Sequence, residues 1–503
     1  MWLLLTVVAG LSFAALTTPH FSLAQETRQD ARQQQEADED RATRSAHDAS
    51  TRDGSDTRGA QRALDPPPGE EPDASPPPAE PEPREQANPP EPSRDDRVGI
   101  TAMRQRLGAN APAGRGIVIA QVEGKPGQYL PLKQGRWTGS TTVVAQGGPS
   151  EAFGHAGMVG RTIYGTGGVA PGIDLVHSYP VNAWMEDVLR VGSPKPPAET
   201  PARVVNHSWI AQQHPHASRI LRRADYLVNR HGVLLVAGVN NGRGKVPELL
   251  APAYNGLAVG KHSGNNSGGY TTVEVSGRCK PDLVAVGGTT SSSTGVVTGA
   301  VACLLEYADS LDEPDRAAAG RPEVIKAALL AGAVRGSDWQ PEDGKPLDQH
   351  FGAGELNLDH SLLCLLAGRA EPGKLQRRAG WALDDAGEGD AHRYILTVQQ
   401  PMGAFGIALT WHRRIDGRTY VNREKKTARW IDSPRLTDFD LRLIDLDTKE
   451  AVAESASAID NVELIHLPAT EPGRYAIEVE RVGKGVDPRW QYGLAYLLHP
   501  PAE

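Results

Sequence analysis

Ser291 stands at the start of a segment, residues 290–306, whose composition predicts a buried helix. Small residues such as Gly295 and Gly299 would let this helix lie close to other backbone. A serine at a helix N-terminus commonly caps the helix by accepting a hydrogen bond from a backbone N–H group. It can instead be a nucleophile whose developing oxyanion meets the free N–H groups of the first turn. The segment alone favours the capping role, so residues elsewhere must decide between the two.

Two further side chains could complete a proton-transfer chemistry with this serine. Glu123 directly follows a strand-like run, residues 117–122, and open parallel sheets bind ligands just beyond the ends of such strands. His155 lies among small residues at the start of an expected helix, where a general base can be closely approached. Taken alone, each has a commoner role: a solvated turn residue for Glu123 and an exposed loop histidine for His155.

Paired asparagines, Asn240 and Asn241, close another apolar run that begins at residue 232. A side-chain amide at the end of a buried strand can donate a hydrogen bond to an oxyanion. The alternative is ordinary Asn-Gly turn chemistry, because Gly242 follows.

The elements that would position these residues are short aliphatic runs separated by helical segments. The runs are rich in β-branched residues and do not alternate with polar ones, as is typical of strands buried on both faces of a parallel sheet. They lie at residues 117–122, 175–176, 203–206, 233–237 and 257–259. Apolar residues recur at helical spacing in residues 217–229. This alternation predicts an α/β fold with a parallel sheet over residues 98–373.

The C-terminal part of the chain has a different period. After an expected linker at residues 374–390, apolar residues alternate with polar ones at 439–443 and 475–479. Turn signals such as residues 471–473 separate the runs, so residues 391–503 are predicted to form a β-sandwich.

The N-terminal part predicts export rather than a folded domain. Residues 1–24 have the apolar stretch and small-residue end of a signal peptide, but no positive charge precedes the apolar run, so an uncleaved anchor is the alternative. We therefore expect a secreted, periplasmic or cell-surface protein without stable membrane insertion after cleavage. Residues 25–97 are charged and proline-rich, with Leu64 their only large aliphatic residue, which predicts a disordered spacer.

The composition limits which partners and cofactors are expected. The formal net charge is −9 and no basic tract stands out, so nothing indicates nucleic-acid binding. The cysteines, Cys279, Cys303 and Cys364, are too few for a disulfide framework and lack metal-site spacing. Acidic turns such as residues 445–447 could hold structural calcium, but a solvated loop is the commoner role because no complete ligand set is present. We expect no cofactor and a monomer.

The ordered set of acid, histidine, asparagine and serine, each at a strand or helix end, resembles the subtilisin-like serine proteases, or subtilases. Other segments between residues 98 and 368 are similar to blocks of that family. They are GVAPG at 168–172, VNHS at 205–208, AYNGLAVG at 253–260, KPDLVA at 280–285 and GAGELN at 352–357. The resemblance implies a three-layer subtilisin-like fold with a mostly parallel sheet, followed by a sandwich similar to those appended to bacterial proteases.

The resemblance also implies roles for individual residues. Ser291 would be the nucleophile, His155 its general base and Glu123 the acid that orients the histidine. Asn240 falls on the oxyanion position, and Ser208 and Trp209 fall on the strand that lines the primary specificity pocket. The implied activity is hydrolysis of peptide or protein substrates by an exported serine endopeptidase.

Several residues depart from the family pattern. Glutamate stands where the family has aspartate, and Thr289, Gly295 and Val239 replace a glycine, a proline and a glycine. Ser292 and Ser293 adjoin the proposed nucleophile, and only the register set by residues 297–299 selects Ser291. The alternatives are a catalytically inactive secreted binding or surface protein with this fold, and an esterase using the same residues. Trp209 could equally be sheet packing.

Overall fold

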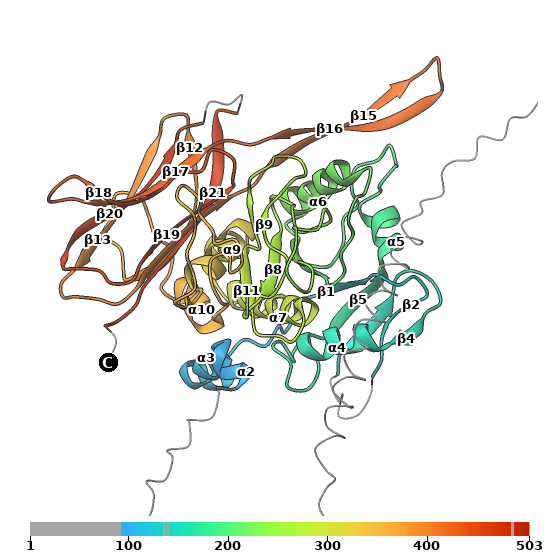
Figure 1. Cartoon of the computed structure of the whole chain (residues 1–503), viewed down its shortest axis with the longest axis horizontal. Helices are drawn as coiled ribbons and strands as arrows, with labels where there is room; N and C mark the ends of the chain where they lie inside the picture. The colour runs from blue at the N-terminus through green and yellow to red at the C-terminus, as the bar shows by residue number, and fades with distance from the viewer. Residues whose placement is uncertain (1–91, 134–136, 138–139, 484–486, 502–503) are drawn as a thin grey trace, which may run out of the picture. The chain divides into compact units, whose positions relative to one another are not determined.

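Seven strands form one parallel sheet in the first half of the folded chain (Figure 1). The spatial order is β11–β8–β7–β6–β1–β5–β3, and every neighbouring pair is parallel. The strands are β1 (Ile119–Glu123), β3 (Thr142–Ala145), β5 (Leu175–Pro180), β6 (Val204–His207), β7 (Leu234–Gly238), β8 (Leu257–Lys261) and β11 (Leu283–Ala285). The parallel sheet predicted from the non-alternating aliphatic runs is confirmed.

The computed structural model describes residues 92–133, 137, 140–483 and 487–501. The predicted signal peptide, residues 1–24, and most of the predicted spacer, residues 25–97, lie outside the described residues. At the end of the spacer the chain is helical in α2 (Arg94–Arg97), which precedes α3 (Ile100–Leu107). Within the described part of the chain, no helix combines the length and apolar character needed to cross a membrane.

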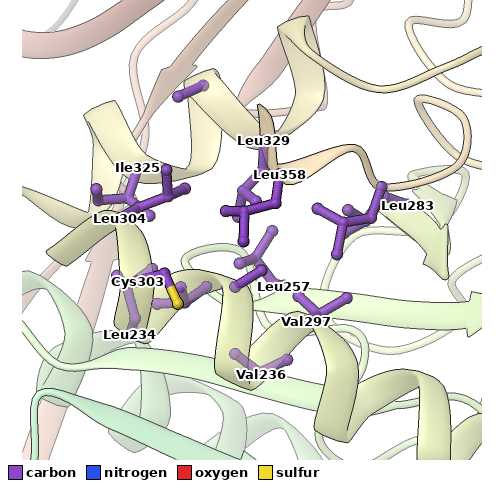
Figure 2. Packing of buried hydrophobic residues seen from close by; sticks show 14 of the residues in the cluster. Leu234, Val236, Leu257, Leu283, Val297, Cys303, Leu304, Ile325, Leu329 and Leu358 are labelled. Carbon is purple, nitrogen blue, oxygen red and sulfur yellow. The ribbon is translucent and has the colours of Figure 1, made fainter. Parts of the chain in front are cut away.

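Successive residues of each central strand point to opposite faces of the sheet, which makes the α/β region three-layered. Leu234 and Val236 of β7 join one apolar cluster, whereas Leu235 and Ala237 join the other. The first cluster includes apolar residues of α4 (Gly154–Ile163). It also includes residues of α7 (Thr290–Asp309), α9 (Pro322–Ala331) and α10 (Leu358–Leu366), some of which Figure 2 shows beside residues of the sheet. The second includes the apolar face of α6 (Ala217–His231).

Helix α7 is buried almost throughout and carries its small residues where other backbone comes close. A Cβ atom on Gly299 would lie 2.6 Å from Cβ of Val169, and one on Gly295 would lie 3.2 Å from the Thr162 side chain. These glycines therefore let α7 approach the end of α4 and the segment that follows it, as the sequence predicted.

Short elements connect the sheet and its helices. They are η1 (Gly108–Asn110), β2 (Gln128–Pro131), β4 (Glu151–Phe153), α5 (Val181–Ala183), the π-helix η2 (Trp184–Val188), β9 (Gly269–Tyr270), β10 (Cys279–Lys280) and α8 (Asp315–Ala319). All three cysteines are buried and free.

Two antiparallel four-stranded sheets form the predicted sandwich. One has the order β12–β21–β14–β19 and comprises β12 (Ala379–Gly387), β14 (Phe405–Trp411), β19 (Val462–Leu467) and β21 (Arg489–Leu498). The other has the order β13–β20–β17–β18 and comprises β13 (Ala391–Val398), β17 (Phe439–Asp445), β18 (Ala451–Ser455) and β20 (Gly473–Arg481). The expected linker at residues 374–390 needs correction, because it contains β12, a full sandwich strand whose core residues include Trp381.

A long hairpin, β15 (Arg414–Asn422) and β16 (Thr427–Arg435), leaves the sandwich and runs toward α6 (Figure 1). Trp430 packs at its α6 side, with the Arg223 guanidinium 4.5 Å from one ring and the Tyr226 ring 5.5 Å away. The Thr419 hydroxyl donates to the carbonyl of Pro194 at 2.7 Å. The hairpin thus ties the sandwich to the α/β region along α6.

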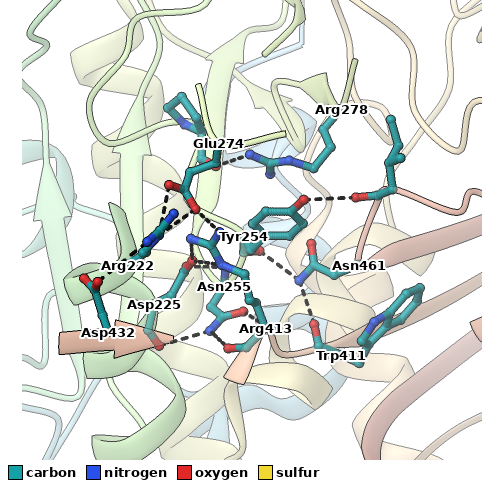
Figure 3. A network of polar contacts seen from close by, with 12 residues as sticks. Arg222, Asp225, Tyr254, Asn255, Glu274, Arg278, Trp411, Arg413, Asp432 and Asn461 are labelled. Carbon is teal, nitrogen blue, oxygen red and sulfur yellow. Dashed lines mark hydrogen bonds and ion pairs between the residues drawn. The ribbon is translucent and has the colours of Figure 1, made fainter. Parts of the chain in front are cut away.

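A buried ion-pair network joins the same two regions (Figure 3). Arg413, which lies between β14 and β15, donates from Nε to the Asp225 carboxylate at 2.8 Å and also pairs with Glu274. Its backbone exchanges two hydrogen bonds of 2.8 Å with the side-chain amide of Asn255. The Arg413 guanidinium lies 4.5 Å from the Tyr254 ring centroid. Because the charged side chains are almost wholly buried, their pairing is needed to offset desolvation.

We expect Arg413→Met to destabilise the protein by about 3–5 kcal/mol, because it leaves Asp225 buried without its ion-pair partner and leaves Glu274 with Arg222 alone. The measurement is the urea unfolding midpoint followed by tryptophan fluorescence. Arg489→Met is the matched control, since Arg489 pairs with Asp385 on the surface and its side chain is 53% exposed. An Arg413→Met midpoint as close to wild type as that of the control would contradict a stabilising role for the network.

Candidate active site

Glu123 and His155 meet at one edge of the parallel sheet. Glu123 is the last residue of β1 and is fully buried, whereas His155 is the second residue of α4 and its side chain is 32% exposed. The Glu123 Oε2 atom lies 2.7 Å from Nδ1 of His155. A buried carboxylate at this distance fixes the protonated nitrogen of a neutral imidazole as Nδ1 and leaves Nε2 as the basic atom. The acid and the histidine that the sequence singled out are therefore paired.

Ser291 is the second residue of α7 and is not the residue that caps this helix. The N-cap is Thr289, whose hydroxyl accepts a hydrogen bond from the backbone N–H of Ser292 at 3.1 Å. Ser291 is partly exposed, and its hydroxyl donates instead to the carbonyl of Ser208 at 3.2 Å. A threonine before a helix is itself a capping signal, so this assignment could have been made from the sequence.

The two neighbouring serines have different surroundings. Ser293 is fully buried and its hydroxyl donates to the carbonyl of Ala285 at 2.8 Å, which removes it from any substrate. Ser292 is partly exposed, and its Oγ lies 3.1 Å from Sδ of Met158. Met158 follows His155 by three residues on α4, so the first turn of α7 packs against the helix that carries the histidine. Ser291 and Ser292 are therefore the two partly exposed serines of these three.

Asn240 and Asn241 follow β7 at the same edge of the sheet. The backbone of Asn240 is held by Ser267, whose hydroxyl accepts from the Asn240 N–H at 2.9 Å. Asn241 reaches the start of α7, where its Oδ1 accepts from the N–H of Thr290 at 2.8 Å. Asn241 thus anchors the residue next to Ser291, a role that the sequence analysis missed because only the fold brings residues 241 and 290 together.

Ser208 links β6 to α7. Its hydroxyl donates to Oδ1 of Asn206 at 2.9 Å, and the Asn206 amide donates to the hydroxyl of Thr298 at 2.9 Å. Ser208 also lies within 3.3 Å of the Ser291 carbonyl. These contacts hold the strand beside the first turns of the helix.

Trp209 is 7% exposed and donates from Nε1 to Nδ1 of His207 at 3.1 Å. The rings of Trp184 and Trp209 contact His207 edge to face, with centroids at 5.4 Å and 5.7 Å. This arrangement favours packing as the role of Trp209. Burial lowers the pKa of His207 to about 3, because the interior disfavours the imidazolium ion.

Acid should destabilise the protein through His207. The folded state holds this histidine neutral, whereas the unfolded chain binds its proton below about pH 6.5. The contribution of neutral His207 to the free energy of unfolding is therefore fully present above pH 6.5 and is lost between pH 6.5 and about 3. The total loss is roughly 4–5 kcal/mol at 1.36 kcal/mol per pKa unit. In His207→Phe, urea midpoints measured from pH 8 to pH 4 should fall less steeply than in the wild type. Parallel slopes for the two proteins would show that His207 does not carry this effect.

No group of three or more His, Cys, Asp or Glu side chains is placed to hold a metal ion in the described ranges. At the acidic turn 445–447, the Asp445 carboxylate accepts backbone N–H bonds from Asp447 and Thr448 at 2.8 Å and 3.1 Å. This carboxylate therefore closes its own turn.

Comparison with known proteins identifies the α/β region. Residues 140–354 match the family model described as the subtilase family. Over these residues the chain is similar to the subtilase family. The matched subtilase segment includes His155, Asn240 and Ser291 but begins after Glu123, so the acid is placed by its 2.7 Å contact with His155.

Solved structures of proteases resemble the chain at low identity. A mutant of the protease domain of PatA is 20% identical, with a TM-score of 0.37, and covers 51% of this chain and 98% of its own. MycP1 from Mycobacterium smegmatis is 16% identical, with a TM-score of 0.36, and covers 54% of this chain and 86% of its own. No curated protein matches the sequence.

Proposed function

We propose that this protein is an exported serine endopeptidase with Ser291, His155 and Glu123 as its catalytic triad. The observation that carries the proposal is the 2.7 Å contact between a fully buried carboxylate and a partly exposed histidine in a subtilase domain. A buried carboxylate is costly unless an opposite charge offsets its desolvation. The imidazolium that forms during catalysis would supply that charge. The predicted signal peptide supports export.

In this mechanism the Ser291 hydroxyl attacks the carbonyl carbon of a peptide bond while His155 takes the hydroxyl proton on Nε2. Glu123 stabilises the resulting imidazolium through Nδ1–H and keeps the ring oriented. The protonated histidine then donates to the leaving amine, and a water molecule repeats the sequence to release the acyl group. We assign oxyanion stabilisation to the Asn240 side-chain amide and a backbone N–H at the start of α7.

Glutamate can replace the usual aspartate because the chemistry needs a carboxylate charge at Nδ1 and not a particular side-chain length. The additional methylene changes where the backbone must lie for the carboxylate to reach Nδ1. In this chain Oε2 of Glu123 reaches Nδ1 of His155 from the end of β1.

A second candidate, a binding protein that retains the fold without activity, is favoured by the bond from Ser291 to the Ser208 carbonyl. A hydroxyl has one proton, so this bond must break before His155 can receive that proton. Rotation about the Ser291 Cα–Cβ bond would be sufficient, and substrate binding is the event that we expect to favour it.

The test is incubation of the purified full chain with a fluorophosphonate probe, followed by mass-spectrometric mapping of the labelled peptide. The endopeptidase proposal predicts a single label on Ser291 and none after heat denaturation. Absence of labelling in protein shown to be folded would support the binding protein instead. Hydrolysis of ester but not peptide substrates by the labelled enzyme would identify an esterase.

A further inference from the structure

A row of buried polar groups lies directly behind Glu123. Gln121 precedes Glu123 by two residues on β1, so both side chains point to the same face of the strand. Both residues are fully buried, as is Tyr164 at the C-terminal end of α4. Polar side chains at such positions are retained only when they are hydrogen-bonded, and these three are bonded to one another.

The bonds run in one direction through the row. The Tyr164 hydroxyl donates to Oε1 of Gln121 at 2.6 Å. The Gln121 amide then donates one proton to Oε1 of Glu123 at 2.8 Å and the other to the carbonyl of Ala156 at 2.9 Å. The opposite orientation of the amide would place its oxygen against a carboxylate and a carbonyl, so the surroundings fix the assignment.

Gln121 therefore holds both partners of the catalytic pair. One amide proton fixes the Glu123 oxygen that does not face His155, and the other fixes the main chain of the residue after His155. A glutamate has one more rotatable bond than an aspartate, and a second point of attachment removes that freedom.

Tyr164 is in turn held in place. Its ring meets Trp137 edge to face at 5.7 Å, and a Cβ atom on Gly160 would lie 2.5 Å from its hydroxyl oxygen. Burial, with a smaller effect of the Glu123 charge, raises the pKa of Tyr164 well above its ordinary value. The hydroxyl therefore remains a donor throughout the pH range of a peptidase.

We propose that Gln121, supported by Tyr164, is a positioning residue that adapts this active site to glutamate. The inference rests on the proposed function, because it assigns Glu123 to the triad. It predicts that changes at Gln121 act on the basicity of His155 and on turnover, not on substrate binding.

The principal test is Gln121→Leu, which keeps most of the volume but donates no hydrogen bond. The pKa of His155 is measured by NMR in the full chain, with its signal assigned by its loss in His155→Asn. We expect this pKa to rise. A buried carboxylate that loses a donor is less stable beside a neutral ring than beside a cation, so the imidazolium form is favoured.

In the same variant we expect kcat for peptide hydrolysis to fall about 10- to 100-fold, the loss typical of one hydrogen bond to a charged group, with KM unchanged. Tyr164→Phe should show the same two changes to a smaller extent, because Gln121 keeps its amide donors. In the Glu123→Ala background, Gln121→Leu should cause no further loss of kcat, since no carboxylate remains to be positioned.

Tyr394→Phe is the matched control. It also removes one buried tyrosine hydroxyl, which contacts the Tyr492 hydroxyl at 2.8 Å in the sandwich. It should leave the pKa of His155 and kcat for peptide hydrolysis at their wild-type values. An unchanged His155 pKa in folded Gln121→Leu would overturn the inference. If that variant does not fold, a Tyr164→Phe result equal to Tyr394→Phe would do so. If the proposed function is wrong, the fluorophosphonate probe will not label Ser291 in the wild type. In that case the inference about Gln121 is still tested by comparing the His155 pKa in the wild type and in Gln121→Leu.

Discussion

Replacing Ser291 with alanine should reduce kcat for peptide hydrolysis about a million-fold, the magnitude measured when the serine nucleophile of subtilisin is removed. In the proposed mechanism the loss is large because only Ser291 forms the acyl-enzyme, and without it His155 has no hydroxyl to activate. The residual rate should correspond to water attacking a bound substrate near the oxyanion donors. The measurement is release of a fluorophore from a peptide substrate, with active sites titrated by the fluorophosphonate probe.

Ser292→Ala provides the matched comparison for this result. Ser292 is also partly exposed in the first turn of α7, but its Oγ contacts Met158 Sδ. We expect this variant to retain labelling and turnover within a few-fold of wild type. If Ser292→Ala lost activity while Ser291→Ala retained it, the nucleophile would be Ser292 and the register of the helix start would need revision.

The sequence predicted the sheet because its physical basis is local. A strand buried on both faces must be apolar at successive positions, and β7 meets that condition with all five residues buried. The carboxyl ends of parallel strands lie at one edge, so Glu123 after β1 and Asn240 after β7 could be expected near each other. Their catalytic roles, like that of Ser291, stay predictions.

The sequence did not predict features that depend on long-range contacts. Tyr164 and Gln121 are 43 residues apart, and each alone looks like an ordinary residue of a helix end or a strand. The pairing of Arg413 with Asp225 joins residues 188 positions apart in two regions of different secondary structure. Such pairs have no periodicity or spacing that a single sequence could display.

Strand β12 was missed for a different reason. Its residues alternate irregularly between buried and partly buried positions, and it includes Gly380 and two adjacent aspartates, Asp384 and Asp385. Glycine and aspartate are depleted in strands, so composition favoured a linker. Pairing with β21 along its whole length overrides this preference.

Glu123→Ala should lower kcat by about 10⁴-fold if Glu123 is the third member of the triad. Alanine removes the charge that stabilises the imidazolium of His155 and frees the ring to adopt the wrong tautomer. It also leaves the Gln121 amide without one acceptor in a buried site. Hydrolysis of the same peptide substrate from pH 6 to pH 9 measures the loss, and an unchanged rate would remove Glu123 from the triad.

Two further substitutions separate the contributions of Glu123. Glu123→Gln preserves the shape but not the charge, so we expect it to be nearly as impaired as Glu123→Ala. Glu123→Asp preserves the charge, but its shorter side chain cannot keep both the 2.7 Å contact with His155 and the 2.8 Å bond from Gln121 without backbone movement. It should retain more activity than either neutral variant and less than the wild type. Full activity in Glu123→Asp would mean that the site does not depend on the length of its acid, whereas an active Glu123→Gln would mean that it does not depend on its charge.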